Sequence, residues 1–293
     1  NVLANAETQH EGAKETNFSL EKALRMQKLA RPQIAFLKER GAGVYIEMPS
    51  MVISTNSKEA ELLRARFEML KAHYPDLRLI GADEISAIEP KVVEGRSEEE
   101  KQHLIALYSM GYAVDYEKLA ESFVREGDKE AKERSKDFRA YFKTKVRGIN
   151  RDKGGNYVIR TSEGVFRARA ISICAGPYSL MFARDLHLNG AEDFAILPVA
   201  GSFYYTKEKF LNGKVYTPQD ETIKFARVHG DRAVYDANVT RFGPTAILLP
   251  FFERYHFLTV TDFIKMGVLT GREYVKALIA VLGDRKLAPF VLK

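Results

Sequence analysis

An arginine followed by a glycine-proline pair stands between two apolar runs in the second half of the chain. Residues 240–246 read Thr-Arg-Phe-Gly-Pro-Thr-Ala and continue as Ile-Leu-Leu-Pro-Phe-Phe-Glu-Arg. A glycine-proline pair forces the backbone into a sharp turn. A guanidinium binds a carboxylate through two parallel hydrogen bonds. Arg241 is therefore a candidate clamp for a ligand that carries a carboxylate.

A histidine precedes this run, in the sequence Phe-Ala-Arg-Val-His-Gly-Asp at residues 225–231. Free histidine has a pKa of about 6.5, so its imidazole can accept a proton near neutral pH. A lone histidine is more often a structural residue than a catalytic one. His229 is thus a candidate general base, with the structural role as the alternative. Arg227 is a less specific second cation.

A third candidate lies where the apolar run 170–175 meets Gly176 and a predicted helix at 179–186. Small residues let the backbone approach a ligand closely, and a helix N-terminus favours negative charge. An almost wholly apolar run is typical of a central strand in a parallel sheet. We expect Cys174 to be a small buried residue of that strand. A meander of three strands should precede it, at 141–149, 157–161 and 165–169.

Other elements are predicted from periodicity and from capping residues. We expect a helix that begins at Asn17 or Ser19, is kinked or split at Pro32, and ends at Gly41. Further helices are predicted at 57–73 with Ser57 as the cap, 84–88 with Asp83 as the cap, 115–136, 260–268 and 272–282. Short strands are predicted at 44–48 and 51–55, joined by Pro49-Ser50, and then at 199–206, 214–217, 224–229 and 246–249 as an antiparallel sheet.

Composition narrows the class of protein. The 293 residues allow one large or two smaller domains. No apolar run reaches the roughly 18 to 20 residues of a membrane span. A single cysteine excludes an internal disulfide and fits a reducing compartment. The net charge of +6 is that of a slightly basic solvated surface, with attraction to anionic lipid or substrate as the alternative. No nucleic-acid partner and no metal-ligand set are predicted.

These segments together resemble the malate:quinone oxidoreductases, FAD-dependent enzymes of the D-amino-acid-oxidase-like flavoprotein group. The resemblance rests on residues 225–231 and 240–246, on Asn-Ala-Glu-Thr-Gln-His-Glu-Gly at 5–12, and on Pro-Val-Ala-Gly-Ser-Phe-Tyr-Tyr at 198–205. It implies an α/β and α+β architecture. A partial FAD-binding domain of the glutathione-reductase type would be joined to a substrate domain with a mixed, mainly antiparallel sheet and flanking helices. The implied division is 1–43 and 115–197 for the FAD domain, and 44–114 and 198–293 for the substrate domain.

The resemblance also implies a cofactor site built from several segments. Asn5, Thr8, His10 and Gly12 would lie near the isoalloxazine ring, and Ala6 stands where a serine is common. Val146 would touch the adenine through its backbone. Ala175 and Gly176 would lie near the ribose or the pyrophosphate.

The implied activity is oxidation of (S)-malate to oxaloacetate, with electrons passing through FAD to a membrane quinone. His229 would take the hydroxyl proton, the hydride would go to the flavin, and Arg241 would hold a substrate carboxylate. Arg227 and Thr245 would assist in binding the substrate. Such an enzyme associates peripherally with a bacterial cytoplasmic membrane, or with the mitochondrial inner membrane in a eukaryote.

The glycine-rich turn with which this family grips the FAD pyrophosphate does not occur in the sequence, nor does the family's C-terminal segment. We therefore expect the chain by itself not to hold FAD tightly. Either it is the central piece of a larger enzyme, or it is a non-catalytic, FAD-free subunit whose apolar 170–175 edge is covered by a protein partner. An L-2-hydroxyglutarate-type 2-hydroxy-acid dehydrogenase is a second enzymatic alternative.

Overall fold

The computed structural model describes residues 7–41, 43–219, 228–245, 247–254, 256–268, 271–285 and 288. The chain forms two compact units, and each is described by itself. Unit 1 comprises Asn1–Lys136 and Gly201–Thr245. Unit 2 comprises Asp137–Ala200 and Ala246–Lys293. Asn5 and Arg227 lie outside the described residues, so the predictions for them stay untested.

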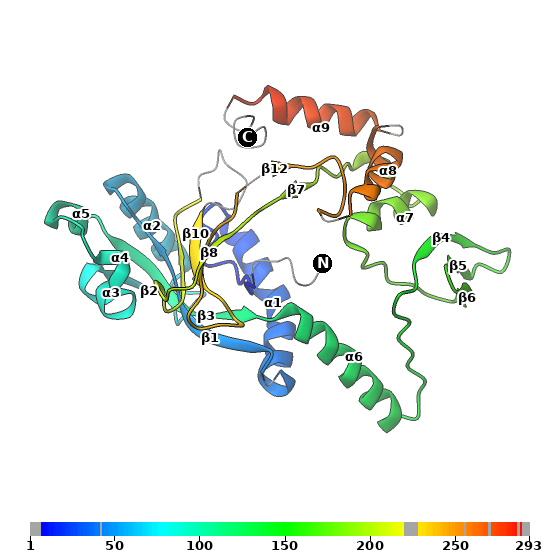
Figure 1. Ribbon diagram of the computed structural model, residues 1–293, viewed down its shortest axis with the longest axis horizontal. Coiled ribbons are helices and arrows are strands. Elements are labelled where there is room, and N and C mark those ends of the chain that lie inside the picture. Colours follow the sequence, from blue (N-terminus) through cyan, green and yellow to red (C-terminus); the bar gives the residue numbers. More distant parts are fainter. Residues whose placement is uncertain are drawn as a thin grey trace. The chain divides into compact units, whose positions relative to one another are not determined.

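Unit 1 is built on a seven-stranded mixed sheet with the order β2-β3-β1-β9-β10-β11-β8 (Figure 1). Neighbouring strands are antiparallel except β1 and β9, which are parallel. This confirms the predicted mixed, mainly antiparallel sheet. The strands are β1 (Tyr45–Ile53), β2 (Arg78–Gly81), β3 (Ile105–Val114), β8 (Tyr204–Thr206), β9 (Lys214–Tyr216), β10 (His229–Arg232) and β11 (Thr240–Gly243).

Helices cover both faces of this sheet, because alternate residues of its strands are apolar on either side. Val52 and Leu107 pack with Leu63 and Leu70 of α2, whereas Met51 and Ala106 pack on the other face with Ile85 of α3. The helices of unit 1 are α1 (Leu20–Arg40), α2 (Ser57–Leu70), α3 (Ala82–Ile88), α4 (Pro90–Val93), α5 (Glu98–Gln102) and α6 (Tyr116–Glu133).

The prediction of two strands joined at Pro49-Ser50 was wrong. β1 is one strand rather than two, and it pairs with β3 through Pro49 opposite Met110. Its parallel pairing with β9 begins only at Ser50, so the missing proline N–H interrupts no bond of the β9 ladder. Helix α1 runs through Pro32 from Leu20 to Arg40, so of the two predicted alternatives the split was wrong, and the kink stays a prediction.

The capping predictions were partly right. Ser19 caps α1 and accepts a hydrogen bond from the Lys22 N–H, and Gly41 ends the helix. Asn56, rather than Ser57, caps α2. Asp83 lies inside α3, whose first residue follows Gly81, so it does not act as the predicted cap.

Unit 2 contains the predicted antiparallel meander of β4, β5 and β6, followed by helices (Figure 1). Phe263 packs edge-on against Phe252 and Tyr274, which ties α8 and α9 together. Its elements are β4 (Val146–Arg151), β5 (Tyr157–Thr161), β6 (Gly164–Ala168), α7 (Ser179–Asp185), β7 (Val199–Ala200) paired with β12 (Ile247–Leu248), α8 (Val260–Phe263), a π-helical segment Ile264–Val268, and α9 (Arg272–Gly283).

The prediction of a buried central strand at 170–175 was wrong. These residues form no strand in the structure, and Cys174 is exposed. An apolar strand needs hydrogen-bonded neighbours on both sides. The segment has none among the residues that the structure describes.

Candidate functional site

The candidate site of unit 1 lies on one face of its sheet, where β9, β10 and β11 run side by side. Asp231 pairs with Lys214 on one side and with Arg241 on the other, while His229 pairs with Tyr216 and Gly243. Residues opposite each other on neighbouring strands share a face, as do residues two apart on one strand. The two catalytic candidates, His229 and Arg241, therefore project from the same face.

Phe203 links these two side chains further. Its ring centroid lies 5.3 Å from the Arg241 guanidinium carbon and 5.4 Å from the His229 ring, which it meets edge-on. The other neighbour of the imidazole is Tyr216, with ring centroids 4.6 Å apart. His229 is buried. The structure thus brings the two predicted residues together around one aromatic ring.

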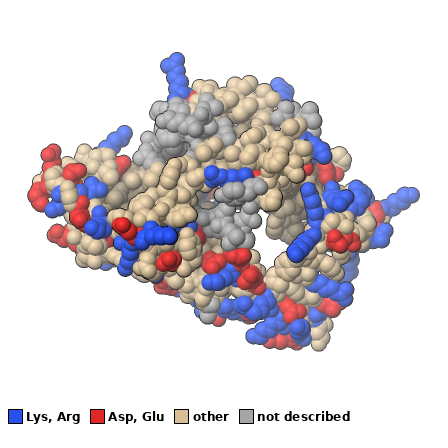
Figure 2. Space-filling view, viewed as in Figure 1, with Lys and Arg blue, Asp and Glu red and all other residues tan. Residues whose placement is uncertain are grey.

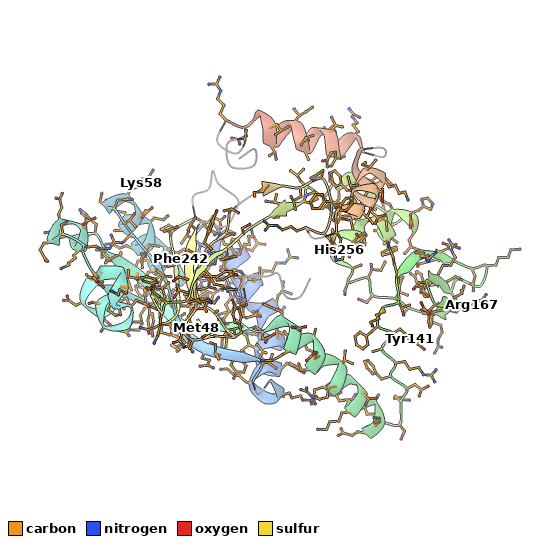
Figure 3. The ribbon with its side chains drawn as sticks, in the orientation of Figure 1. Met48, Lys58, Tyr141, Arg167, Phe242 and His256 are labelled. Atoms are coloured by element: carbon orange, nitrogen blue, oxygen red, sulfur yellow. The ribbon has the colours of Figure 1, made fainter. Side chains whose placement is uncertain are left out.

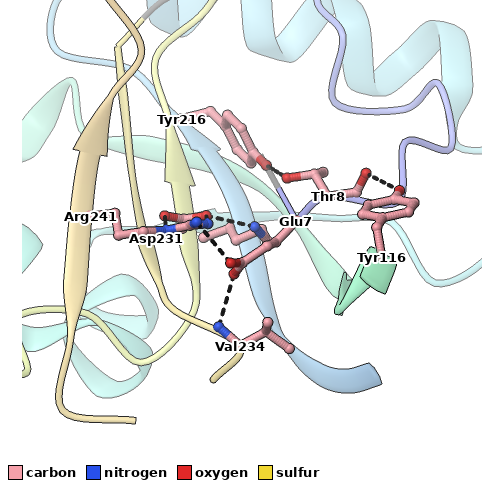
Figure 4. A network of polar contacts seen from close by, with 8 residues as sticks. Glu7, Thr8, Tyr116, Tyr216, Asp231, Val234 and Arg241 are labelled. Carbon is pink, nitrogen blue, oxygen red and sulfur yellow. Dashed lines mark hydrogen bonds and ion pairs between the residues drawn. The ribbon is translucent and has the colours of Figure 1, made fainter. Parts of the chain in front are cut away.

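Arg241 takes part in a buried cluster of four charges, hereafter the charge cluster: Glu7, Lys214, Asp231 and Arg241. Its Nε and Nη2 donate to the two carboxylate oxygens of Asp231, at 3.1 and 2.7 Å, and its Nη1 lies 2.9 Å from Glu7 Oε1. Lys214 Nζ donates to Asp231 Oδ2 at 2.7 Å. Figure 4 shows Arg241 between these two carboxylates. With two cations and two anions, the cluster is balanced.

The pKa values of the two carboxyl groups in the charge cluster are shifted in opposite directions. Burial raises the pKa of Glu7, and the Val234 N–H and Arg241 only partly offset this. Burial also acts to raise the pKa of Asp231, but Lys214 and Arg241 outweigh it and hold that pKa below its ordinary value. Asp231 is therefore a firm anion, whereas Glu7 is the carboxyl of the cluster that is more easily protonated.

Glu7 fastens the N-terminal segment to the sheet. Its Oε2 accepts the Val234 N–H at 2.9 Å, and its carbonyl accepts the Val114 N–H at 3.0 Å. The next residue, Thr8, accepts at its carbonyl from the Tyr116 hydroxyl, and its own hydroxyl lies 3.3 Å from that of Tyr216 (Figure 4). Thr8, one of the predicted flavin-side residues, is thus held beside the same sheet that carries His229.

Two residues from α2 and the turn that follows it hold the rest of this segment. Arg66 donates to the carbonyls of Gly12 and Phe18, and the Tyr74 hydroxyl bonds to the carbonyl of Glu11 at 2.9 Å. Gly12 has φ +90°, and a Cβ there would lie 2.4 Å from the Ala23 carbonyl oxygen. Only glycine fits this crossing over the first turn of α1.

A cavity of about 810 Å³ opens beside this segment, and Thr8 and His10 line it. The His10 imidazole pairs with the Glu15 carboxylate on its wall. Burial acts to raise the Glu15 pKa, but the hydrogen bond and the charge of His10 leave that pKa lowered. The wall is formed by Thr8, Gln9, His10, Glu15, Asn17, Phe18, Lys22, Met26, Gln33, Tyr116 and Gln219.

This cavity is large enough for a small molecule. Its volume lies in the range of small-molecule sites, and its wall combines aromatic and aliphatic side chains with many amide groups. Among the described residues, four buried oxygens of this wall meet no hydrogen-bond donor, those of Gln9, Glu15, Asn17 and Gln219, and one buried donor, Gln33 Nε2, meets no acceptor.

The remaining predicted residues are placed as follows. Thr245 accepts the Ser202 N–H at its hydroxyl, at 3.0 Å, beside the cis peptide bond between Gly243 and Pro244. In unit 2, Val146 begins β4. Gly176 has φ +55° and begins the single 3-10 turn before α7, with the Ala175 N–H donating to Ser179 Oγ. The roles predicted for these residues stay predictions.

Sequence reasoning did not single out Glu7, Asp231 or Lys214 as members of a site. Asp231 had a detectable signal, because it follows His229 by two positions in a strand and so shares its face. Lys214 had none, since an isolated lysine in a short strand is ordinarily exposed. In the structure its side chain is 1% exposed.

The chain belongs to the FAD dependent oxidoreductase family, whose model matches residues 4–265. FAD is the cofactor of this family, and the relatives described next indicate a narrower group within it.

Two curated relatives are malate:quinone oxidoreductases. The chain is 30% identical over 300 residues to the malate:quinone oxidoreductase of Helicobacter pylori, covering 99% of this chain and 64% of that protein. It is 30% identical over 272 residues to a probable malate:quinone oxidoreductase of Campylobacter jejuni, covering 89% of this chain and 59% of that protein. The chain therefore spans about three fifths of the length of these relatives. An L-2-hydroxyglutarate dehydrogenase of Escherichia coli is 27% identical over 219 residues.

Solved structures agree on the fold. An L-alpha-glycerophosphate oxidase from Mycoplasma pneumoniae aligns with a TM-score of 0.60 at 16% identity, covering 84% of this chain and 62% of that one. A glycine oxidase from Geobacillus kaustophilus aligns with a TM-score of 0.57 at 18% identity, covering 89% and 70%. At such identities these similarities establish the architecture and nothing about substrate.

The described helices include none that is both long and apolar enough to cross a bilayer.

Proposed function

We propose that the protein acts in the FAD-dependent oxidation of (S)-malate to oxaloacetate, with a membrane quinone as the electron acceptor. The observation that carries this proposal is the similarity to malate:quinone oxidoreductases across 99% of the chain. It is supported by His229 and Arg241, which share one sheet face and contact the same phenylalanine. Bound FAD supplies the hydride acceptor.

In this proposal His229 takes the proton of the malate hydroxyl. The imidazole lies between Tyr216 and Phe203, which restrict its orientation. It is buried, and a buried base meets little competing water. Replacing a general base typically lowers turnover about 10²- to 10⁴-fold. We expect His229→Gln to reduce kcat by this amount while KM for malate changes little.

Arg241 offers the positive charge for a malate carboxylate, in competition with Glu7. The balanced charge cluster has no net charge for an anion while Glu7 is ionised. The raised pKa of Glu7 makes protonation of this carboxyl the least costly way to leave one positive charge in excess. Malate binding should therefore favour the protonated form of Glu7.

Two substitutions, Glu7→Gln and Arg241→Lys, test the role assigned to Arg241. Glu7→Gln keeps the shape of the side chain and leaves the cluster with a net positive charge. If Arg241 binds malate, KM for malate should fall in Glu7→Gln and rise about tenfold or more in Arg241→Lys, since lysine lacks the planar fork. If KM is the same in both variants and in the wild type, Arg241 only fastens Glu7 and Asp231, and the clamp role is wrong.

The activity itself is tested with purified protein, malate and a soluble quinone analogue. Flavin absorbance together with malate-dependent quinone reduction supports the proposal. L-2-Hydroxyglutarate is assayed in parallel, because the Escherichia coli relative carries that name. A colourless protein that reduces no quinone with either acid would favour the alternative of a non-catalytic subunit.

We further propose that the protein works at the periphery of a membrane, where its quinone is dissolved. The excess of positive charge lies in the meander region, residues 137–169, which contains nine basic and three acidic residues. Figure 2 shows Lys and Arg side chains gathered over β4, β5 and β6. Positive surfaces are attracted to anionic lipid. Sedimentation with vesicles of anionic and of zwitterionic lipid tests this association.

A further inference from the structure

Helix α9 of unit 2 presents apolar side chains on two of its sides. Tyr274 is buried and meets Phe263 edge-on, with ring centroids 5.3 Å apart, so this side of the helix packs on its own unit. Val275, Ile279 and Leu282 are 48, 65 and 39% exposed. Their spacing of four and three residues places them on one face of the helix. They form a stripe of large apolar side chains, hereafter the α9 stripe, along the exposed side.

A helix that is apolar on several sides is ordinarily buried. Between Tyr274 and Leu282 the only charged residue is Lys276, yet the α9 stripe faces solvent in the described part of the chain. In Figure 2 the surface over α9 is mostly tan, with Lys and Arg side chains near its ends. Phe257 and Leu258, in the turn before α8, add further exposed apolar surface to unit 2. Exposed apolar surface of this kind marks a site of contact with a partner or a membrane.

The charges beside the α9 stripe favour a negatively charged partner. Arg272 and Lys276 are four residues apart, so they lie one above the other along one flank of the stripe, while Glu273 lies farther round the helix. Lys276 pairs with Glu273, but an exposed pair of this kind contributes little. Residues 254–293 contain seven basic and three acidic residues. A second copy of the chain would bring the same excess of positive charge to this face, whereas anionic lipid complements it.

The length of α9 decides how it can meet a bilayer. Its twelve residues extend over about 18 Å, well short of the roughly 30 Å of a hydrocarbon core. The helix is therefore too short to span a membrane. A helix with an apolar stripe and flanking cations instead lies in the plane of the interface. Its apolar side chains then reach the acyl chains, and the long Lys and Arg side chains reach the headgroups.

We propose that α9 is the membrane-docking element of this protein and lies in the interface of a bilayer that contains anionic lipid. The inference rests on the membrane association proposed above and adds the segment that makes the apolar contact. The basic meander can only attract a membrane surface, because charges act from outside the hydrocarbon. The α9 stripe gains free energy only when it leaves water, so Ile279 at its centre is the most informative residue.

The experiment measures how much of the full chain sediments with vesicles of two compositions, equal parts phosphatidylcholine and phosphatidylglycerol, or phosphatidylcholine alone. The wild type should bind the anionic vesicles more tightly. Ile279→Glu should weaken that binding about tenfold or more, because it removes an apolar contact and adds a charge that must stay in water. Arg272→Gln should weaken binding about fivefold, and only where the lipid is anionic.

Leu29→Glu is the matched control. Leu29 lies on α1 in unit 1 and, like Ile279, is 65% exposed. The two substitutions therefore make the same change of net charge at equally exposed helical positions. Leu29→Glu should bind both kinds of vesicle as the wild type does. Thermal unfolding of each variant verifies that it is folded.

Three results would overturn the assignment of α9. If Ile279→Glu and Leu29→Glu bind vesicles equally, α9 is not the docking element, and the association proposed for the meander stands without it. A wild-type chain that binds neither kind of vesicle overturns both. Sedimentation velocity without lipid tests the competing occupant, since a dimer that Ile279→Glu dissociates and Leu29→Glu does not would show that a second copy covers the α9 stripe. Failure of malate oxidation with a soluble quinone analogue leaves the vesicle result unaffected, so the two proposals fail separately.

Discussion

The charge cluster and the cavity lie in the same unit and share the segment that begins at Glu7, yet they satisfy their polar groups in opposite ways. In the cluster every charge meets an opposite charge of the chain, at 2.7 to 3.1 Å. In the cavity wall four acceptors and one donor, Gln33 Nε2, meet no partner among the described residues. The first arrangement pairs its charges within the chain, whereas the second leaves buried polar atoms without a partner in the described part of the chain. The burial of a polar group therefore does not by itself show whether the group is paired within the chain.

The largest expected effect comes from removing one charge of the cluster. Asp231→Asn keeps the shape of the side chain but removes the carboxylate that Lys214 and Arg241 both contact. Breaking a buried pair by removing one partner costs about 3 to 5 kcal/mol, and we expect urea unfolding to show a loss of that size. Asp137→Asn, in the exposed pair with Arg139, is the control and should change stability by less than about 1 kcal/mol. An Asp231→Asn protein as stable as this control would show that the cluster fastens nothing.

A second prediction concerns Lys14, a half-buried residue whose ammonium donates to the Ser109 hydroxyl at 2.7 Å. Burial lowers the pKa of Lys14 to about 8. The unfolded chain then binds more protons than the folded one between that value and the ordinary pKa, so stability rises with pH across this window. The rise amounts to at most about 3 kcal/mol. Lys14→Met should flatten this part of the stability–pH profile, whereas Lys58→Met, on the exposed first turn of α2, should not.

For the cavity the expected sign is the opposite. Gln219→Leu removes an unpaired buried acceptor, so the free energy of unfolding of the ligand-free protein should rise, by about 1 kcal/mol. A variant that loses stability without ligand would indicate that the Gln219 amide supports the fold, and the contrast with Asp231 would then disappear.

The smallest effect is expected where the two regions meet. Tyr216→Phe removes the hydroxyl that lies 3.3 Å from Thr8 Oγ1 but keeps the ring against His229. Such a long hydrogen bond should contribute no more than about 0.5 to 1 kcal/mol. Thermal unfolding would measure the change, and Tyr45→Phe serves as a control for loss of a tyrosine hydroxyl elsewhere. A loss comparable to that of Asp231→Asn would mean that the cluster and the cavity wall are one cooperative structure.

Surface charge offers a contrast outside unit 1. Arg167, on β6, is exposed, and Figure 3 shows it on the meander together with Tyr141, whose ring contacts Phe166 edge-on. Among the described residues Arg167 forms no ion pair, so its charge faces solvent rather than a partner within the fold. Arg241 is buried and paired with two carboxylates, whereas Arg167 is exposed. The two arginines differ only in their surroundings.

Much of the fold followed from local patterns. The meander was predictable because turn residues separate its alternating strands, and α1 and α6 because caps and apolar spacing agree, at Ser19 and Asp115. The strand at β11 was missed, since Thr240–Gly243 was interpreted only as the approach to a turn. The expected strand at 170–175 shows the reverse error: its composition fits a sheet, but a strand exists only where neighbours pair with it.

The sequence by itself determined the family, the mixed architecture and the residue types for hydroxy-acid chemistry, because these depend on ordered motifs and on short-range periodicity. Only the tertiary structure decided which charges are already neutralised. Glu7 and Arg241 lie at opposite ends of the described part of unit 1, and their contact depends on the register of β10 against β11 and on the path of the N-terminal segment. Local sequence carries no record of such a pairing, because electrostatic partners are set by distance in space and by the exclusion of water.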